Sequence, residues 1–206
     1  GQLAHSVASR PLVEGLPTGN DAEVTGVRDI SWRADAPATL VWAEAQDGGD
    51  PNRDAKVRDA VFMQAAPFEK PPVTLAQLGS RFGGITWGRG DLALLSESWW
   101  KTRNTKTWRI APDDAAQSPQ LLWDRDAQDR YNDPGRAGVV RDVNGRSRLQ
   151  TTADGRSIFL YGQGASPEGD RPFVDRFDIE SRKATRLFHS QAPVYSAPVA
   201  LLDQEG

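Results

Sequence analysis

The stretch Ile85–Leu95 reads ITWGRGDLALL, in which a turn rich in Gly and Asp separates two short apolar strands. The same phrase occurs twice more, as Ile30–Trp42 (ISWRADAPATLVW) and as Thr151–Tyr161 (TTADGRSIFLY). Recurrence of one strand–turn–strand phrase at a spacing of roughly 55 to 65 residues is in the range expected for the blades of a β-propeller. The sequence therefore predicts an all-β fold, a partial β-propeller of about three four-stranded antiparallel blades.

Each phrase is followed by two further segments of strand length, which complete a four-stranded unit. These segments are Ala60–Met63 and Val73–Leu78 in the first unit, Thr105–Ile110 and Gln120–Trp123 in the second, and Phe173–Ile179 and Thr185–Phe188 in the third. Phe173–Ile179 alternates apolar and charged residues, which is the pattern of a strand with one buried face. We therefore expect each unit to form a small antiparallel sheet.

The repeat also predicts how the chain is divided. We expect blades at residues 27–79, 80–130 and 131–190, the end of a preceding blade or a linker at 1–26, and the start of a further blade at 191–206. Within these flanks, Arg10–Thr18 and Pro193–Leu202 resemble pieces of neighbouring blades. Known propellers close with about four to eight blades, so three blades leave two sheet faces without a neighbour. We therefore expect a fragment of a longer polypeptide, whose open blade faces favour self-association.

Charge and composition argue against several classes of partner. With 25 basic residues, 28 acidic residues and a net charge of −3, the chain lacks the basic character by which proteins hold nucleic acid. No apolar run approaches the roughly 20 residues needed to cross a bilayer, so we expect no membrane span. The absence of cysteine excludes disulfides, thiol catalysis and thiolate metal sites, and it suits either the cytoplasm or a bacterial envelope compartment such as the periplasm.

Residues suited to nucleophilic catalysis are sparse. The Gly-x-Ser-x-Gly turn that presents the nucleophile of α/β-hydrolases does not occur in the sequence. The two histidines are His5, near the N-terminus, and His189, at the end of a predicted strand, and we interpret both as surface residues. The sequence therefore predicts no catalytic residue and no cofactor in this chain.

Closely spaced carboxylates raise the alternative of a propeller glycosidase, because that chemistry needs two carboxyl groups across one bond. Glu44 with Asp47, and Asp124 with Asp126, are such pairs. Proximity in the sequence says little about separation in space, and acids of this kind are more commonly turn residues or lie on solvated strand faces. The glycosidase is therefore kept as a third alternative for the function.

The loop Asp47–Asp54 (DGGDPNRD) carries oxygen-bearing side chains at alternate positions from Asp50, as a calcium loop requires. However, Ala55 stands where such a loop needs Gly, and Val61 stands where it needs a bidentate Glu. We therefore expect no metal site here. The loop is better interpreted as a long hairpin connection in which the Gly pair adopts positive φ.

The stretch Glu97–Arg109 (ESWWKTRNTKTWR) gathers three tryptophans among four cations. As a hairpin that turns near Arg103 and Asn104, it can clamp an acidic or aromatic ligand through cation–π contacts and charge-assisted hydrogen bonds. The candidate ligand-binding residues are Trp100, Lys101, Arg103 and Lys106. In the alternative, which is the more common role, the indole rings pack between adjacent blades and the cations face solvent.

Five strings of the chain are informative together: Ser31–Asp35 (SWRAD), Trp42–Asp50 (WAEAQDGGD), Arg81–Trp87 (RFGGITW), Glu97–Arg103 (ESWWKTR) and Gly162–Gly169 (GQGASPEG). In this order they resemble the β-propeller of glutamyl endopeptidase-like enzymes, which are serine peptidases of the prolyl oligopeptidase family. The resemblance extends from about Val27 to Leu202.

The resemblance implies a parent with two domains, a propeller that filters and docks peptides and a C-terminal α/β-hydrolase domain with a Ser-Asp-His triad. None of that triad lies in this chain, so the chain alone is expected to be inactive. Such enzymes prefer to cleave beside glutamate, which makes Lys101, Arg103 and Lys106 candidates for attracting acidic peptide substrates. They occur in bacteria and in chloroplasts, so a plant origin would imply the chloroplast.

Two hypotheses for the function therefore lead. In the first, the chain is a non-catalytic propeller segment that gates and docks peptides for a hydrolase domain outside it. In the second, it is a stand-alone propeller-type binding or scaffold protein. A hydrolase domain further along the parent gene distinguishes the first from the second.

Overall fold

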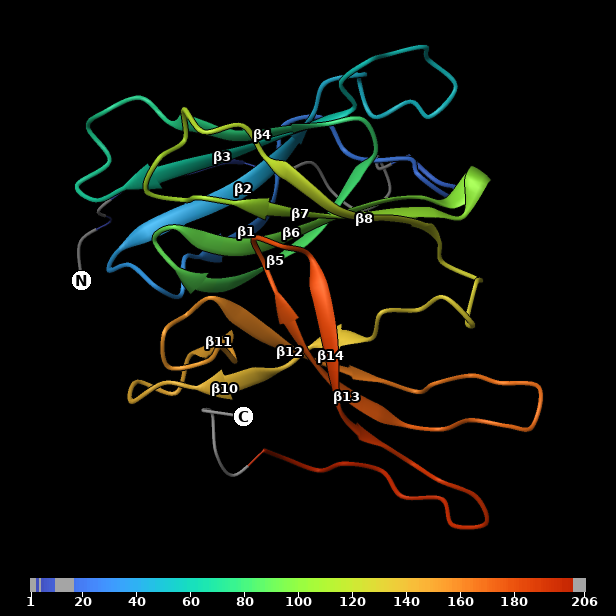
Figure 1. Cartoon of the computed structure of the whole chain (residues 1–206). Coiled ribbons are helices and arrows are strands. Elements are labelled where there is room, and N and C mark those ends of the chain that lie inside the picture. Colours follow the sequence, from blue (N-terminus) through green and yellow to red (C-terminus); the bar gives the residue numbers. More distant parts are fainter. Residues whose placement is uncertain (1–2, 4, 10–16, 202–206) are drawn as a thin grey trace. The chain divides into compact units, whose positions relative to one another are not determined.

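The computed structural model describes residue 3, residues 5–9 and residues 17–201. Over these residues the chain is all-β, with fourteen strands. It divides into two compact units, residues 1–126 and residues 127–206, and each unit is described by itself (Figure 1). Among the residues described, no helix has the length and apolar character needed to cross a lipid bilayer.

Unit 1 contains two four-stranded antiparallel sheets in which each strand pairs with the next along the chain. The first sheet consists of β1 (Val27–Trp32), β2 (Thr39–Ala45), β3 (Asp59–Ala65) and β4 (Val73–Leu78). The second sheet consists of β5 (Arg81–Arg89), β6 (Leu92–Trp99), β7 (Asn104–Ile110) and β8 (Gln120–Asp126). The strand segments predicted for this region are confirmed.

The core of unit 1 is built from apolar side chains of both sheets. The first sheet contributes Val41, Val61, Leu75, Ala76 and Leu78, and the second contributes Trp87, Ala93, Leu95 and Ile110. Val61, Ala93 and Leu95 are completely buried. Successive side chains of a strand point to opposite faces of the sheet. The apolar residues on one face of each strand therefore form that strand's contribution to this core.

Unit 2 contains one four-stranded antiparallel sheet with the strand order β14-β13-β12-β9. Its strands are β9 (Arg136–Ala137), β12 (Ser157–Gly162), β13 (Phe173–Asp178) and β14 (Lys183–His189). A separate two-stranded hairpin, β10 (Val139–Arg141) with β11 (Ser147–Leu149), is inserted between β9 and β12. The predicted segments in Phe173–Ile179 and Thr185–Phe188 are confirmed as β13 and β14.

The first strand of the third phrase differs from the prediction. Thr151 makes only an isolated bridge, to Ile158, and the two-residue strand β9 occupies the place beside β12 instead. The glycine before β9 explains how this short strand can lie so close to β12. Gly135 has φ +89°, and a Cβ there would lie 2.8 Å from the backbone of Tyr161.

The two flanking pieces that the sequence suggested have different outcomes. Residues 193–201 form no strand, and Leu202 lies outside the described residues. Of Arg10–Thr18, residues 10–16 also lie outside them. The described chain nevertheless contains three four-stranded antiparallel sheets, so the predicted fold class, an all-β partial propeller, is confirmed.

Candidate functional site

The candidate hairpin joins β6 to β7 through a short 3₁₀ turn over Trp100–Thr102. Arg103 follows the turn in the left-handed region, with φ 55°, and its backbone N–H donates to the Trp100 carbonyl at 3.2 Å. The sequence placed the turn near Arg103 and Asn104, within a residue or two of this geometry. The side chains of all three residues of the 3₁₀ turn are exposed.

Three of the four predicted ligand-binding residues gather at this turn. The Arg103 guanidinium carbon lies 3.6 Å from the centroid of the Trp100 ring, and the Trp100 side chain is 52% exposed. Lys101 is exposed beside them. Among the carboxylates of the described residues, none lies within ion-pair distance of Lys101 or Arg103, so the turn presents two cations and one aromatic face to solvent.

Asp21 holds this turn in place, a role for which the sequence carries no local signal. Its carboxylate accepts the backbone N–H groups of Trp100 at 2.9 Å and Lys101 at 3.3 Å. Its backbone carbonyl accepts the Arg81 Nε–H at 2.7 Å. The turn is thus tied to a segment that precedes the first sheet, about eighty residues earlier in the chain.

Lys106, the fourth predicted residue, lies on β7 and not at the turn. Its Nζ is 3.8 Å from the Asp124 carboxylate on β8, and it lies opposite Glu97 in the pairing of β6 with β7. Asp124 also accepts from the Asn104 amide at 2.6 Å. The positive charge of Lys106 is therefore already partnered, unlike that of Lys101.

The two other tryptophans of the stretch have packing roles. Trp99 lies beneath the Arg58 guanidinium, 4.0 Å from the ring centroid. The Trp108 Nε1–H donates at 2.9 Å to the carboxylate of Glu97, which is 1% exposed. Buried Trp N–H groups usually find such a partner, and for these two rings the packing alternative describes the structure.

A buried charge network lies beneath the hairpin. Arg81, the first residue of β5, donates to both oxygens of Asp47, at 2.9 and 2.8 Å, and to Asp59 at 3.0 Å. Arg58 donates to Asp47 at 2.9 Å, and Arg28 pairs with Asp59. Burial by itself raises the pKa of Asp47, but the hydrogen bonds from Arg81 and Arg58 outweigh it and lower that pKa below its ordinary value.

The carboxylate pairs that suggested a glycosidase are engaged in local contacts. Glu44 accepts the Trp42 Nε1–H at 2.8 Å, and Asp47 is fully buried in the network. In the proposed calcium-like loop, the Gly49 N–H donates to Asp47 at 3.0 Å, which is a turn contact. Within the described residues, no group of three or more His, Asp or Glu side chains is arranged to hold a metal ion.

The histidines occupy two different settings. The His5 ring stacks on Phe68, with 4.9 Å between the ring centroids. His189 ends β14, every residue of which is exposed. Both histidines are exposed, which agrees with their interpretation as surface residues.

Two plant proteins match nearly the whole chain. It is 40% identical to "Probable glutamyl endopeptidase, chloroplastic" of Arabidopsis thaliana over 208 aligned positions, and 38% identical to the protein of the same name in Oryza sativa subsp. japonica over 207. Each alignment covers 98% of this chain. The resemblance to glutamyl endopeptidases is confirmed. The chain spans 22% of the length of each of these glutamyl endopeptidases.

Two other comparisons add less. No protein-family model matches the sequence. Among solved structures, an oligogalacturonate lyase in complex with manganese superposes with a TM-score of 0.41 and 12% identity, over 80% of this chain and 36% of that one. A likeness at this level carries no argument about function, so the match to the glutamyl endopeptidases is the one that bears on it.

Proposed function

We propose that this chain is a non-catalytic β-propeller segment of a glutamyl endopeptidase-like serine peptidase of the prolyl oligopeptidase family. Its role is to gate and dock peptide substrates for an α/β-hydrolase domain in the same polypeptide. The observation that carries the proposal is the alignment of 98% of the chain, at 38–40% identity, with proteins named glutamyl endopeptidase that are more than four times as long. In this proposal, the catalytic residues lie in the part of the polypeptide outside this segment.

The turn between β6 and β7 is the proposed docking element for acidic peptides. An exposed Trp100 ring with the Arg103 guanidinium stacked on it offers a flat apolar face beside a fixed positive charge. Lys101 adds a second cation next to them. A glutamyl side chain can pack its methylene groups on the ring while its carboxylate meets the cations. Lys106 belongs to the proposed set as a weaker contributor, because Asp124 already partners it.

The test is cleavage of a glutamyl-linked peptide by the complete polypeptide that contains this segment. We expect cleavage that a serine-directed phosphonate abolishes, and no cleavage by the 206-residue chain alone. The glutamine counterpart of the peptide is the matched control for charge. An intact peptide with the complete polypeptide would count against the peptidase role and favour a stand-alone binding or scaffold propeller. Cleavage by the isolated chain would contradict its non-catalytic role.

The compartment follows from the same proposal. Both plant relatives are called chloroplastic, which supports the chloroplast for a chain of plant origin. For a bacterial chain the envelope and the cytoplasm are the alternatives. Fractionation of the source cells, with detection of the complete polypeptide, distinguishes these compartments.

A further inference from the structure

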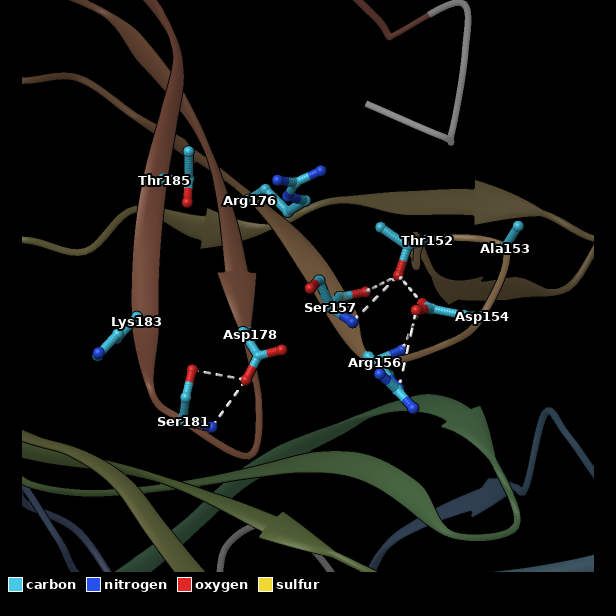
Figure 2. Close-up of a pocket in the computed structure, with 10 residues that line it drawn as sticks. All are labelled: Thr152, Ala153, Asp154, Arg156, Ser157, Arg176, Asp178, Ser181, Lys183 and Thr185. Atoms are coloured by element: carbon cyan, nitrogen blue, oxygen red, sulfur yellow. Dashed lines mark hydrogen bonds and ion pairs between the residues drawn. The ribbon is translucent and has the colours of Figure 1, made fainter.

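A hollow of about 540 Å³ lies at one end of the sheet of unit 2. Figure 2 shows its lining residues arranged around an open centre. One wall is the connection that leads into β12, with Thr152, Asp154 and Arg156. The other wall is the end of β13, the turn after it and the start of β14. Every lining residue belongs to unit 2, so the hollow is a feature of this unit alone.

The strand register explains why polar side chains gather here. Ser157, Asp178 and Lys183 lie in one row across β12, β13 and β14. Two residues along, Arg176 pairs with Thr185. Since side chains two apart in a strand share a face, all five stand on the same face of the sheet. The strand register therefore gives the hollow a floor of polar side chains.

Local turns already engage both carboxylates of the hollow. Asp178 accepts the backbone N–H and the hydroxyl of Ser181, each at 2.7 Å. Asp154 accepts the Thr152 hydroxyl at 2.7 Å and the Arg156 backbone N–H at 2.9 Å. These bonds close the turns at the two walls, as Asp side chains commonly do. In each carboxylate the oxygen that accepts these bonds is Oδ1.

Two cations of the hollow, Arg156 and Lys183, are held much less tightly. The Arg156 side chain is 81% exposed, and its Nε lies 3.9 Å from Asp154, at the limit of an ion pair. Lys183 is exposed, and no carboxylate of the described residues lies within ion-pair distance of it. Arg176 is half-buried on the floor between them. Three cations and two carboxylates thus line a concave surface that carries one net positive charge, next to the hydroxyls of Ser157 and Thr185.

We infer that this hollow is a binding site for an oxyanion, a carboxylate or a phosphate group, held by Lys183 and Arg156 with the hydroxyls of Thr185 and Ser157. Guanidinium and ammonium groups together with hydroxyl donors are the set that recognises such anions. The site is separate in sequence from the β6–β7 turn, and it does not depend on peptidase activity. Its ligand is either an acidic side chain of a peptide or a free or bound phosphate.

Lys183 itself supplies the readout, since a bound anion covers its ammonium group. The complete polypeptide is treated with an acetylating N-hydroxysuccinimide ester, and acetylation of Lys183 is followed by peptide mass spectrometry. Exposed Lys70 serves as the internal reference. Inorganic phosphate and a blocked diglutamyl peptide are titrated separately, with the diglutamine peptide as the neutral control. At an anion concentration about ten times the dissociation constant, Lys183 should react about tenfold more slowly, with Lys70 unchanged.

A pair of charge-matched variants tests the geometry. Arg156→Gln should raise the anion concentration for half-protection about fivefold, because one charge-assisted contact is lost. Arg182→Gln removes the same charge from the residue next to Lys183, but Arg182 does not line the hollow, and the half-protection point should stay within about twofold. Both side chains are exposed, and equal thermal unfolding of the two variants confirms that the fold is intact.

Each outcome is decisive. Protection by both probes supports the shared oxyanion chemistry, and protection by one of them alone identifies the source. If neither probe protects Lys183, if Lys70 is protected equally, or if both variants shift the half-protection point alike, the proposed site is wrong.

Discussion

The Arg81 guanidinium holds the Asp47 carboxylate through two hydrogen bonds, of 2.9 and 2.8 Å, and both side chains are buried. The two residues come from different sheets of unit 1, because Asp47 follows β2 and Arg81 begins β5. Arg81 also reaches the backbone carbonyl of Asp21, which in turn anchors the β6–β7 turn. One ion pair thus links the packing of two sheets to the geometry of the candidate site.

Replacing Arg81 by alanine should lower the free energy of unfolding by about 3–5 kcal/mol, because Asp47 and Asp59 would remain buried without a full complement of charge. Urea unfolding followed by tryptophan fluorescence measures the change. Arg89 is the matched control, since it pairs with Asp91 on the surface, and Arg89→Ala should cost only about 0.2–1 kcal/mol. A loss for Arg81→Ala no larger than that for Arg89→Ala would show that the buried pair does not stabilise the unit.

The same pair predicts how stability depends on pH. Burial raises the pKa of Asp47 and the hydrogen bonds from Arg81 and Arg58 lower it, with the net result below the ordinary value of 3.8. The stabilisation is therefore fully present above that ordinary value and is lost as the pH falls through the lower folded-state value, where the unfolded chain binds more protons.

Asp47→Asn removes this titration. Its free energy of unfolding should be lower than that of the parent chain at neutral pH and should fall less steeply below about pH 4. Urea unfolding at a series of acid pH values gives both curves. The exposed acid of the same connection, Asp54, provides the control Asp54→Asn. If Asp47→Asn loses stability on acidification as steeply as the parent chain, other carboxylates are responsible for the acid sensitivity.

The strands were predictable because each carries its own local signal. Leu92–Leu95 is an apolar run that directly follows a Gly-Asp turn, and the structure places it at the start of β6. The two-residue strand β9 has no such signal, since two residues cannot show an alternating pattern. Its position depends on Gly135, where a Cβ would be too close to the backbone of Tyr161. This close approach is visible only in the folded structure.

The candidate site was predictable only in part, for a similar reason. The hairpin that carries Trp100 and Arg103 is local, so its composition and its turn identify it. Asp21, which holds the turn, lies 79 residues away from Trp100 in the sequence, and an isolated Asp in a loop is an ordinary turn residue. The hollow of unit 2 escaped detection because its polar residues are spread over three strands and meet only through the register.

Gly49 offers a test of how tightly the segment around Asp21 must pack. Its φ is +74°, and a Cβ at this position would lie 1.9 Å from the Glu23 carbonyl oxygen. The Glu23 N–H donates to the Gly49 carbonyl at 3.0 Å. Gly49→Ala should therefore destabilise the chain by about 1–3 kcal/mol. Gly79→Ala is the control, because its nearest atom would be 3.8 Å from the Cβ and its φ is not positive. Equal unfolding midpoints for the two variants would contradict the close approach.

Neutralising the two cations of the β6–β7 turn tests the docking proposal directly. In the complete polypeptide, the double variant Lys101→Gln with Arg103→Gln should raise the KM for a glutamyl peptide about tenfold and leave kcat unchanged, because contacts remote from the reacting bond contribute uniform binding. Lys70→Gln, at an exposed lysine of unit 1, should alter neither constant. Steady-state kinetics with the glutamyl peptide and its glutamine counterpart provide the measurement.

Lys106 allows a sharper version of the same test, because its ammonium group is already 3.8 Å from Asp124. If acidic peptides bind at the turn, Lys106→Gln should change KM by no more than about twofold, since a partnered surface charge adds little attraction. An effect of Lys106→Gln as large as that of the double variant would mean that peptides respond to the overall charge of β7 and its neighbours. In that case the stacked Trp100 and Arg103 pair would not be the element that docks them.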